Sequence, residues 1–307
     1  MKSKKFKMLS LVLTGMFMVG GLTGCGKTEE KNAQKPAAEN KKIGMVISTL
    51  NNPFFVSMKD GATKKAKELG YDLVVVDSQN DAAKERSNVE DLVQQGVGAI
   101  IINPTDSDAV ANAIQVANEK KIPVLTVDRK ANKGDVVCHI ASDNVKGGKM
   151  AADFILEKIG GKGNLVELQG IPGASATRDR GKGFHEGVDG KAGVKVVASQ
   201  PADFDRQKGL SVMENIIQAT PNFQAVFAHN DEMALGAAKA LKGKNIIVVG
   251  FDGNSDAIKA VQNGEMAATV AQQPDLMGSL AVENAIKVVK GETVGKEIPV
   301  DLKLIKK

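Results

Sequence analysis

The sequence predicts an α/β protein made of two doubly wound lobes, each built on a parallel sheet. Short apolar runs rich in valine and isoleucine alternate with longer amphipathic segments along the chain. Near-continuous apolar runs are typical of parallel strands that are covered on both faces. A second series of such units begins at Asn164, after a run that ends near Ser142–Asn144. The body of about 265 residues is also large for one core, so we expect two lobes.

The expected strands follow the apolar runs in order. In the first series they are Ile43–Thr49, Asp72–Asp77, Ala99–Asn103, Pro123–Asp128 and Val136–Ser142. In the second series they are Asn164–Gln169, Val194–Ser199, Ala225–Ala228, Ile246–Phe251 and Ala267–Ala271. Branched apolar residues favour strands, and turn-forming residues separate these runs.

Helix patterns lie between most of the strands. Pro53–Leu69 and Arg206–Thr220 carry apolar residues at spacings of three and four, which predicts amphipathic helices. The acidic pair Asp231-Glu232 favours the start of another helix. The sequence leaves open whether a last helix, Pro274–Lys290, and a strand, Val300–Ile305, return to the first lobe.

The first 24 residues are expected to be an export signal. Lysines precede an apolar run from Met8 to Leu22, which is shorter than the roughly 20 residues that span a bilayer. The tetrad Leu-Thr-Gly-Cys that ends at Cys25 resembles a lipobox; the alternative is a buried cysteine in an ordinary signal or anchor. Residues 25–41 are then the lipidated Cys25 and a polar tether. We therefore expect an extracytoplasmic protein that is anchored to the cell membrane by lipidated Cys25.

The basic net charge belongs to the signal. Residues 1–24 hold four lysines and no acidic residue, so removing them lowers the formal charge from +5 to +1. A nearly neutral body gives no electrostatic reason to expect nucleic acid as a partner. Cys138 has no second cysteine to pair with once Cys25 is lipidated, so no disulfide is expected.

Polar and aromatic residues gather where the strands should end. These residues are Asn52, Phe54, Phe55, Asn103, Asp128 and Arg129 in the first series, and Arg180, Phe204, Asn230, Phe251, Asp252 and Gln272 in the second. Ligands of open α/β sheets bind outside the carboxyl ends of the strands. Two of the ten phenylalanines lie in the signal, and four of the other eight lie at these ends.

This combination of side chains suits a neutral polyol. Rings pack against the C–H faces of a sugar, while carboxylate, guanidinium and amide groups bind its hydroxyls. A simpler alternative exists for the first loop: Pro53 starts a helix, and the two rings that follow it enter the core.

Other chemistries lack their motifs. The loops contain neither a phosphate-binding G-x-x-x-x-G-K-[ST] nor a dinucleotide-binding G-x-G-x-x-G, and G-x-S-x-G is absent. The three histidines have no second ligand at metal spacing except Cys138 beside His139, and adjacent side chains point to opposite faces of a strand. We expect no catalysis, no cofactor and no metal.

Several longer strings carry a resemblance to a known family. STLNNPFF, INPTDSDAV, HIASDN, QPADFDR, HNDEMALGA and VVGFDG together resemble the ribose-binding proteins of bacterial ABC transporters, which have the type I periplasmic-binding-protein fold. The resemblance covers the chain from about Lys42 to its end. One departure concerns location, because the lipobox stands where the best-known relatives are freely periplasmic.

The resemblance implies a three-segment hinge and a sugar between the lobes. The hinge would pass near Ser142–Asn144, Ala271–Gln273 and Val300–Leu302, which divides the chain into an N-terminal lobe of residues 42–142 plus 273–301 and a C-terminal lobe of residues 143–272 plus 302–307. Phe54 and Phe55 would cover one face of the sugar and Phe204 the other. The implied polar contacts and near neighbours of the sugar are Asn52, Asn103, Asp128, Arg129, Ser142, Arg180, Asn230, Phe251, Asp252 and Gln272.

The resemblance also implies a role and partners. The chain would be a monomer that captures D-ribose and delivers it to an ABC permease and its ATPase subunits, with a chemoreceptor as a further partner that the family allows. The open alternatives are the same role for allose, another pentose or a furanone-type signal, the sugar-sensing domain of a LacI-type repressor, and an enzyme such as a sugar isomerase or kinase. A repressor would need a helix-turn-helix where this chain has a signal and tether.

Overall fold

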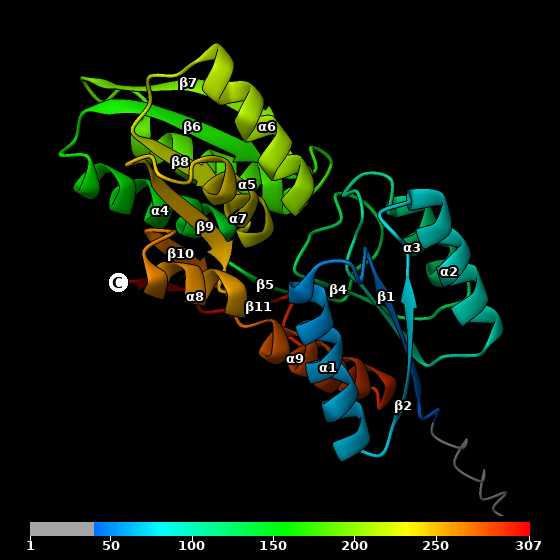
Figure 1. The fold of residues 1–307 in the computed structure, drawn as a ribbon. Helices are drawn as coiled ribbons and strands as arrows, with labels where there is room; N and C mark the ends of the chain where they lie inside the picture. Colours follow the sequence, from blue (N-terminus) through cyan, green and yellow to red (C-terminus); the bar gives the residue numbers. More distant parts are fainter. Residues whose placement is uncertain (1–39) are drawn as a thin grey trace, which may run out of the picture. The chain divides into compact units, whose positions relative to one another are not determined.

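The described chain forms two lobes, each built around a six-stranded sheet. The computed structural model describes residues Asn40–Lys307, so the predicted signal peptide, Cys25 and nearly all of the tether lie outside the described residues. Figure 1 shows one sheet in each lobe. The strand order is β11-β5-β4-β3-β1-β2 in the first sheet and β12-β10-β9-β8-β6-β7 in the second. The predicted pair of doubly wound α/β lobes is therefore confirmed.

The elements alternate as the apolar runs predict. The first series is β1 Lys42–Ile47, α1 Pro53–Glu68, β2 Asp72–Asp77, α2 Ala82–Gln94, β3 Ala99–Ile102, α3 Ala111–Glu119, β4 Val124–Val127 and β5 Cys138–Ser142. The second is α4 Asn144–Lys158, β6 Gly163–Gln169, α5 Ser175–Val188, β7 Val194–Pro201, α6 Arg206–Ala219, β8 Ala225–Ala228, α7 Asp231–Ala240, β9 Ile247–Asp252, α8 Ser255–Asn263 and β10 Ala268–Ala271. The chain ends with α9 Pro274–Val289, β11 Glu297–Val300 and β12 Lys303–Lys306.

The last segment of the chain divides between the two sheets. Helix α9 packs on α1, and the backbones approach so closely that a Cβ on Gly61 or Gly278 would overlap the backbone of the facing helix. Strand β11 then pairs in parallel with β5, whereas β12 pairs antiparallel with β10. The expectation of one strand over Val300–Ile305 was wrong, because the chain crosses between the lobes at Asp301-Leu302.

Both faces of each sheet are covered by helices. In the first lobe α1 and α9 bury one apolar cluster and α2 and α3 bury another. In the second lobe α4 and α5 cover one face, and α6, α7 and α8 cover the other. Two-sided coverage explains why the strands of this chain are apolar runs rather than alternating patterns.

Many helices begin directly after a strand at an asparagine or aspartate. Asn52, Asp143 and Asn230 each accept a hydrogen bond from a backbone N–H in the first turn of the helix that follows. These caps fix the loops at the carboxyl ends of the strands. No helix in the described range is both long and apolar enough to cross a membrane.

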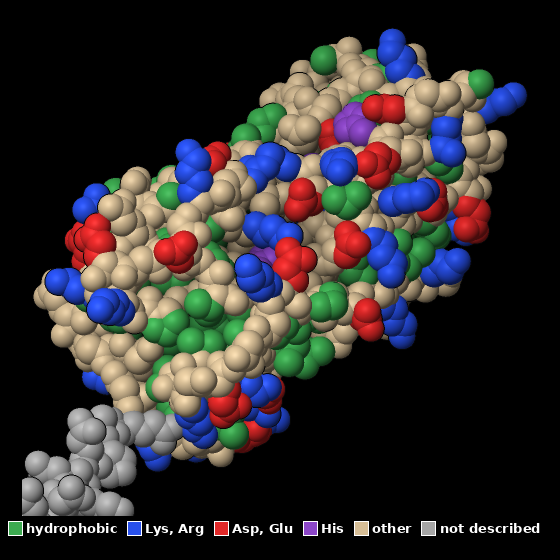
Figure 2. Space-filling view, turned by 180° about the vertical axis from the view of Figure 1, so that it is seen from behind, with side chains coloured by type: hydrophobic (Ala, Val, Ile, Leu, Met, Phe, Trp, Pro, Cys, Tyr) green, Lys and Arg blue, Asp and Glu red, His purple; other side chains and the backbone are tan. Residues whose placement is uncertain are grey.

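Charged side chains cover the surface of the body in a mixed pattern. On the face shown in Figure 2, acidic and basic side chains are interspersed rather than gathered into areas of one sign. This pattern agrees with a body of nearly neutral net charge.

Candidate ligand-binding site

Side chains from both lobes converge on one enclosed cavity. Its lining consists of Asn52, Phe54, Phe55, Asp128, Arg129, Ala176, Arg180, Phe204, Asn230 and Asp252. Nine of these ten residues are predicted site residues; Ala176 was missed, because an alanine carries no polar or aromatic signal. The free space among them is about 10 Å³, which is room for about one water molecule. The two walls therefore lie close together.

The aromatic residues approach the cavity from three loops. Phe54 and Phe55 follow Pro53 at the start of α1, and their rings meet edge to face with centroids 5.3 Å apart. Phe204 lies in the β7–α6 loop with a φ of 60°, and its ring fills the space that a side chain on Gly170 would occupy. Arg129 lies 5.2 Å from the ring centroids of both Phe55 and Phe204. A cation from the first lobe thus contacts rings from both lobes.

The first lobe contributes an ion pair at the end of β4. Asp128 has a φ of 63°, and its Oδ2 accepts a hydrogen bond of 3.1 Å from Asn103 Nδ2 and lies 3.7 Å from Arg129 Nε. Arg129 donates to the carbonyl of Pro104 at 3.2 Å. Burial raises the pKa of the Asp128 carboxyl, and the neighbouring arginines oppose that shift. The second oxygen, Asp128 Oδ1, is buried and has no partner in the described chain.

The second lobe contributes Arg180 and Asp252. Arg180 NH1 donates to the backbone carbonyl of His229 at 2.6 Å and lies 3.6 Å from Asp252 Oδ1. The guanidinium also stacks on the ring of Phe251 at 3.8 Å. Asp252 accepts a hydrogen bond of 2.9 Å from Gln272 Nε2. Burial raises the pKa of Asp252 to about 7, although Arg180 favours its ionised form.

The two asparagines in the lining each serve a second purpose. Asn52 Oδ1 accepts from the backbone N–H of Phe54 at 3.0 Å, and Asn230 Oδ1 accepts from Met233 at 3.0 Å. Because the oxygen of each amide is held by a helix, its NH₂ group is the part that remains for a ligand. Asn230 Nδ2 also donates to the carbonyl of Phe204 at 3.3 Å.

Four predicted site residues lie outside the cavity lining. Asn103 and Gln272 bind the two aspartates, and Phe251 lies against Arg180. Ser142, the last residue of β5, is buried with an unpartnered Oγ and lines a neighbouring cavity. Direct contact of these four with a ligand stays a prediction.

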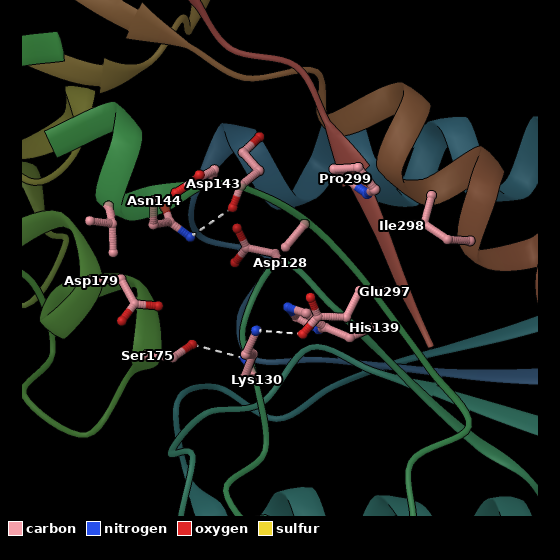
Figure 3. A pocket seen from close by; sticks show the side chains of 13 residues that line it. Asp128, Lys130, His139, Asp143, Asn144, Ser175, Asp179, Glu297, Ile298 and Pro299 are labelled. Atoms are coloured by element: carbon pink, nitrogen blue, oxygen red, sulfur yellow. Dashed lines mark hydrogen bonds and ion pairs between the residues drawn. The ribbon is translucent and has the colours of Figure 1, made fainter. Parts of the chain in front are cut away.

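That neighbouring cavity lies along the first crossing between the lobes. Its volume is about 470 Å³, and its lining includes Asp128, Lys130, His139, Ser142, Asp143, Asn144, Ser175, Asp179 and Glu297 (Figure 3). The backbone N–H of Lys130 donates to Ser175 Oγ at 2.8 Å, and Lys130 Nζ binds Glu297 at 2.8 Å. We call this space the hinge cavity.

Buried charged groups that the sequence did not reveal support the second lobe. Glu167 binds His229 Nε2 at 2.9 Å and also accepts from Ser199. These hydrogen bonds outweigh the effect of burial and lower the pKa of Glu167 to about 2. Asp231 accepts from Asn254 N and Thr269 Oγ1, both at 2.7 Å. The interpretation of Asp231-Glu232 as acids at a helix start is confirmed, since both lie in the first turn of α7.

Comparison with known proteins gives a consistent picture. A model of the periplasmic binding protein domain matches residues 43–293. The Ribose import binding protein RbsB of Salmonella typhimurium is 60% identical over 266 residues, which are 86% of this chain and 90% of that protein. Its counterpart in Bacillus subtilis is 52% identical over 304 residues, with 97% and 98% covered. A periplasmic solute binding protein of Actinobacillus succinogenes, solved with bound D-allose, has a TM-score of 0.81 and 33% identity, covering 86% of this chain and 97% of that one.

Proposed function

The chain belongs to the periplasmic binding protein family, and we propose that it captures D-ribose between its two lobes and delivers the sugar to an ABC import permease. The observation that carries the proposal is the cavity in which rings, aspartates, arginines and amides from both lobes meet. Relatives that are 52–60% identical and named for ribose import support this choice of sugar.

The lining matches the chemistry of a pentose. Two arginines and two aspartates leave the cavity close to neutral overall, so an uncharged ligand fits it. Asp128 Oδ1 has no partner among residues 40–307 and is available to accept a hydrogen bond from a hydroxyl, and the amide NH₂ groups are available to donate. Hydrogen bonds between hydroxyls and ionised groups are stronger than neutral ones. The rings cover the apolar faces of the sugar.

Capture requires the lobes to move. Every lining residue that the prediction named is buried, with exposures of 9% or less, so a ligand reaches the cavity only when the lobes separate. The free space is also smaller than a pentose. In the sugar-bound closed form the two walls must therefore lie slightly farther apart than they do in this structure. A sugar that contacts both lobes stabilises the closed form by its greater affinity for that form.

The residues behind the lining are proposed to orient the lining. Asn103 and Gln272 each hold one aspartate, and Phe251 supports Arg180. Ser142 borders the cleft at the hinge. A direct hydrogen bond from any of them to the sugar is part of the same proposal.

The location and partners extend the proposal. We infer that residues 1–24 direct export, that Cys25 is lipidated, and that residues 26–41 tether the body to the membrane. The body then works as a monomer outside the cytoplasm, and partner subunits hydrolyse ATP. The proposal includes a chemoreceptor as a further partner, which would dock to the closed, ligand-bound form.

A second sugar remains in competition with ribose. The solved relative from Actinobacillus succinogenes holds D-allose at 33% identity, and a small change in ring contacts is enough to change sugar choice. The alternative ligands are therefore allose, which is a hexose, and pentoses other than ribose.

A thermal-shift panel of pentoses and hexoses tests the proposal directly. A ligand that binds only the folded form raises its apparent stability by mass action, and D-ribose should give the largest shift.

Calorimetry of Asp252→Ala should show a loss of about 2 kcal/mol or more in binding, while Glu214→Ala, at an exposed position on α6, is the matched control. No shift with any sugar would contradict a sugar-binding role, and conversion of the sugar during incubation, followed by NMR, would contradict a role without catalysis.

A further inference from the structure

Asn144 lies at the first crossing between the lobes and touches a residue of the sugar cavity. It is the first residue of α4, two positions after the end of β5, and it is 6% exposed. Its side chain lines the hinge cavity and is not part of the sugar-cavity lining. Any effect of Asn144 on a bound sugar must therefore pass through another side chain.

The Asn144 amide makes two hydrogen bonds in different directions. Its Oδ1 accepts from Arg180 Nε at 2.8 Å. Its Nδ2 donates to the backbone carbonyl of Ser142 at 3.4 Å (dashed in Figure 3). A guanidinium only donates and a carbonyl only accepts, so these two partners fix the orientation of the amide. Ser142 ends a strand of the first sheet, whereas Arg180 lies on α5 beside the second sheet.

Asn144 is the acceptor for the Nε edge of the Arg180 guanidinium. The NH1 edge is held by the His229 carbonyl, and one face lies on Phe251. Loss of the Asn144 oxygen would leave a buried N–H without an acceptor, and this costs more than the bond itself contributes. The guanidinium would then rotate toward Asp252, which lies 3.6 Å away.

We propose that Asn144 is a positioning residue that orients Arg180 toward the sugar and links this orientation to the state of the hinge. The inference deepens the proposed function and rests on it. When the lobes rotate apart, the torsions between Ser142 and Asn144 change and the Nδ2 bond across the crossing breaks. The bond to Arg180 lies within the second lobe and persists. Arg180 is thus already oriented when the sugar arrives, and the Ser142 bond favours closure.

Calorimetry with D-ribose on two variants tests the positioning role. Asn144→Ala should weaken binding by about 10- to 100-fold, the range for one hydrogen bond to a charged group. Asn144→Asp keeps an oxygen for Arg180 but loses the donor to Ser142, so it should recover most of that loss. Lys146→Ala, at an exposed position in the same helical turn, should bind as the wild type does. Wild-type affinity in Asn144→Ala, or equal weakness in both variants, would overturn the inference.

A double-mutant cycle separates positioning from general destabilisation. In an Arg180→Lys background, Asn144→Ala should weaken ribose binding less than it does alone, because its partner atom is gone. Additive effects would mean that Asn144 acts elsewhere.

The sugar-free protein gives a readout that does not depend on the ligand. In NMR spectra the Arg180 Nε–H signal should exchange slowly with water in the wild type and in Asn144→Asp, and fast in Asn144→Ala. Slow exchange in all three would contradict the inference even if ribose binds well. If the wild type shows this exchange pattern but does not bind ribose, the choice of ribose as the ligand is wrong, whereas the contact between Asn144 and Arg180 is supported.

Discussion

The two lobes hold their buried aspartates in the same way but supply the neighbouring arginines in different ways. In each lobe an aspartate with a positive φ ends a strand and receives a hydrogen bond from an amide: Asn103 serves Asp128, and Gln272 serves Asp252. The cations differ. In the first lobe Arg129 follows its aspartate directly in the chain, whereas in the second lobe Arg180 comes from another element.

The first arginine is placed by residues close to it in the sequence, whereas the second is held by residues that are distant in the sequence. Arg129 makes one hydrogen bond to a backbone carbonyl, that of Pro104. Arg180 binds Asn144 and the His229 carbonyl, and Glu167 in turn holds His229. The second half of the site therefore depends on more buried polar groups, and we expect it to be the more sensitive half.

Removing the two arginines in turn should produce the largest effects and the sharpest contrast. Arg180→Met leaves the Asn144 amide and the His229 carbonyl without a donor and leaves Asp252 beside Asp231 without its cation. Breaking a buried charge pair in this way costs about 3–5 kcal/mol of folding stability, which thermal melting should register. Removing a buried charged partner costs about 2–5 kcal/mol in binding, so calorimetry should show ribose binding weakened by about 30-fold or more. Arg129→Met should cost less. Equal losses would remove the contrast between the lobes.

The pH dependence of stability separates the lobes by a different property. Burial raises the pKa of Glu85 in the first lobe and of Asp252 in the second, each to about 7. Unfolded carboxyls titrate near pH 4, so between about pH 4 and pH 7 the folded chain holds protons that the unfolded chain has released. The contribution of these two carboxyls to stability should fall as pH rises through this window, by about 1.4 kcal/mol for each unit of pKa shift. His139, whose pKa is lowered by burial to about 4, contributes in the opposite direction.

Melting of the sugar-free protein at pH 5 and pH 8 measures this dependence. Glu85→Gln and Asp252→Asn should each reduce the fall in melting temperature. Glu85 lies outside the sugar-cavity lining and binds the backbone of Thr105. Its contribution to the fall in melting temperature should therefore persist when ribose is bound, whereas the contribution of Asp252 should decrease. A fall that is unaffected by both substitutions would show that other groups titrate.

The two lobes also differ in how the aromatic rings of the cavity are held in place. The ring of Phe204 occupies space that Gly170 leaves open, whereas Phe54 and Phe55 are fixed by the start of α1. Gly170→Ala should displace Phe204 and cost about 1–3 kcal/mol, as overpacked sites do. Calorimetry and thermal melting should both register the loss. Gly295→Ala is the matched control, because this exposed glycine has no positive φ and a Cβ there would meet no atom closer than 3.6 Å.

Substitution of the two capping asparagines should produce the smallest losses of ribose affinity and the smallest difference between the lobes. Asn52→Asp and Asn230→Asp keep the oxygen that caps the helix but lose the NH₂ group. Each also buries a carboxylate in place of a neutral amide, so melting temperatures should fall at neutral pH. Each should weaken ribose binding by about 0.5–1.5 kcal/mol, the net worth of one hydrogen bond. Asn230 should give the larger effect, because it also binds the Phe204 carbonyl. Wild-type affinity in both variants would show that neither amide donates to the sugar.

Most of the fold and of the cavity lining could be predicted, because both follow from rules that act along the chain. Apolar runs marked the strands, and the residues after those runs, such as Phe54 and Asp128, met at the same edges of the sheets. Tertiary contacts were beyond reach. Glu167 lies within strand β6, and nothing near it in the sequence indicates that His229 is its partner. The single strand expected over Val300–Ile305 was wrong, because a crossing between lobes leaves no turn signal inside a short apolar run; only the family resemblance placed a hinge segment near Val300–Leu302.

The return of α9 and β11 to the first lobe has a consequence for the order in which the protein is assembled. All but the edge strand of the second sheet comes from one uninterrupted stretch, β6 to β10. The first sheet lacks β11, and α1 lacks the helix that covers it, until almost the entire polypeptide has emerged. Domains generally mature as units during synthesis; here the half that is made first is the half that must wait for the C-terminus.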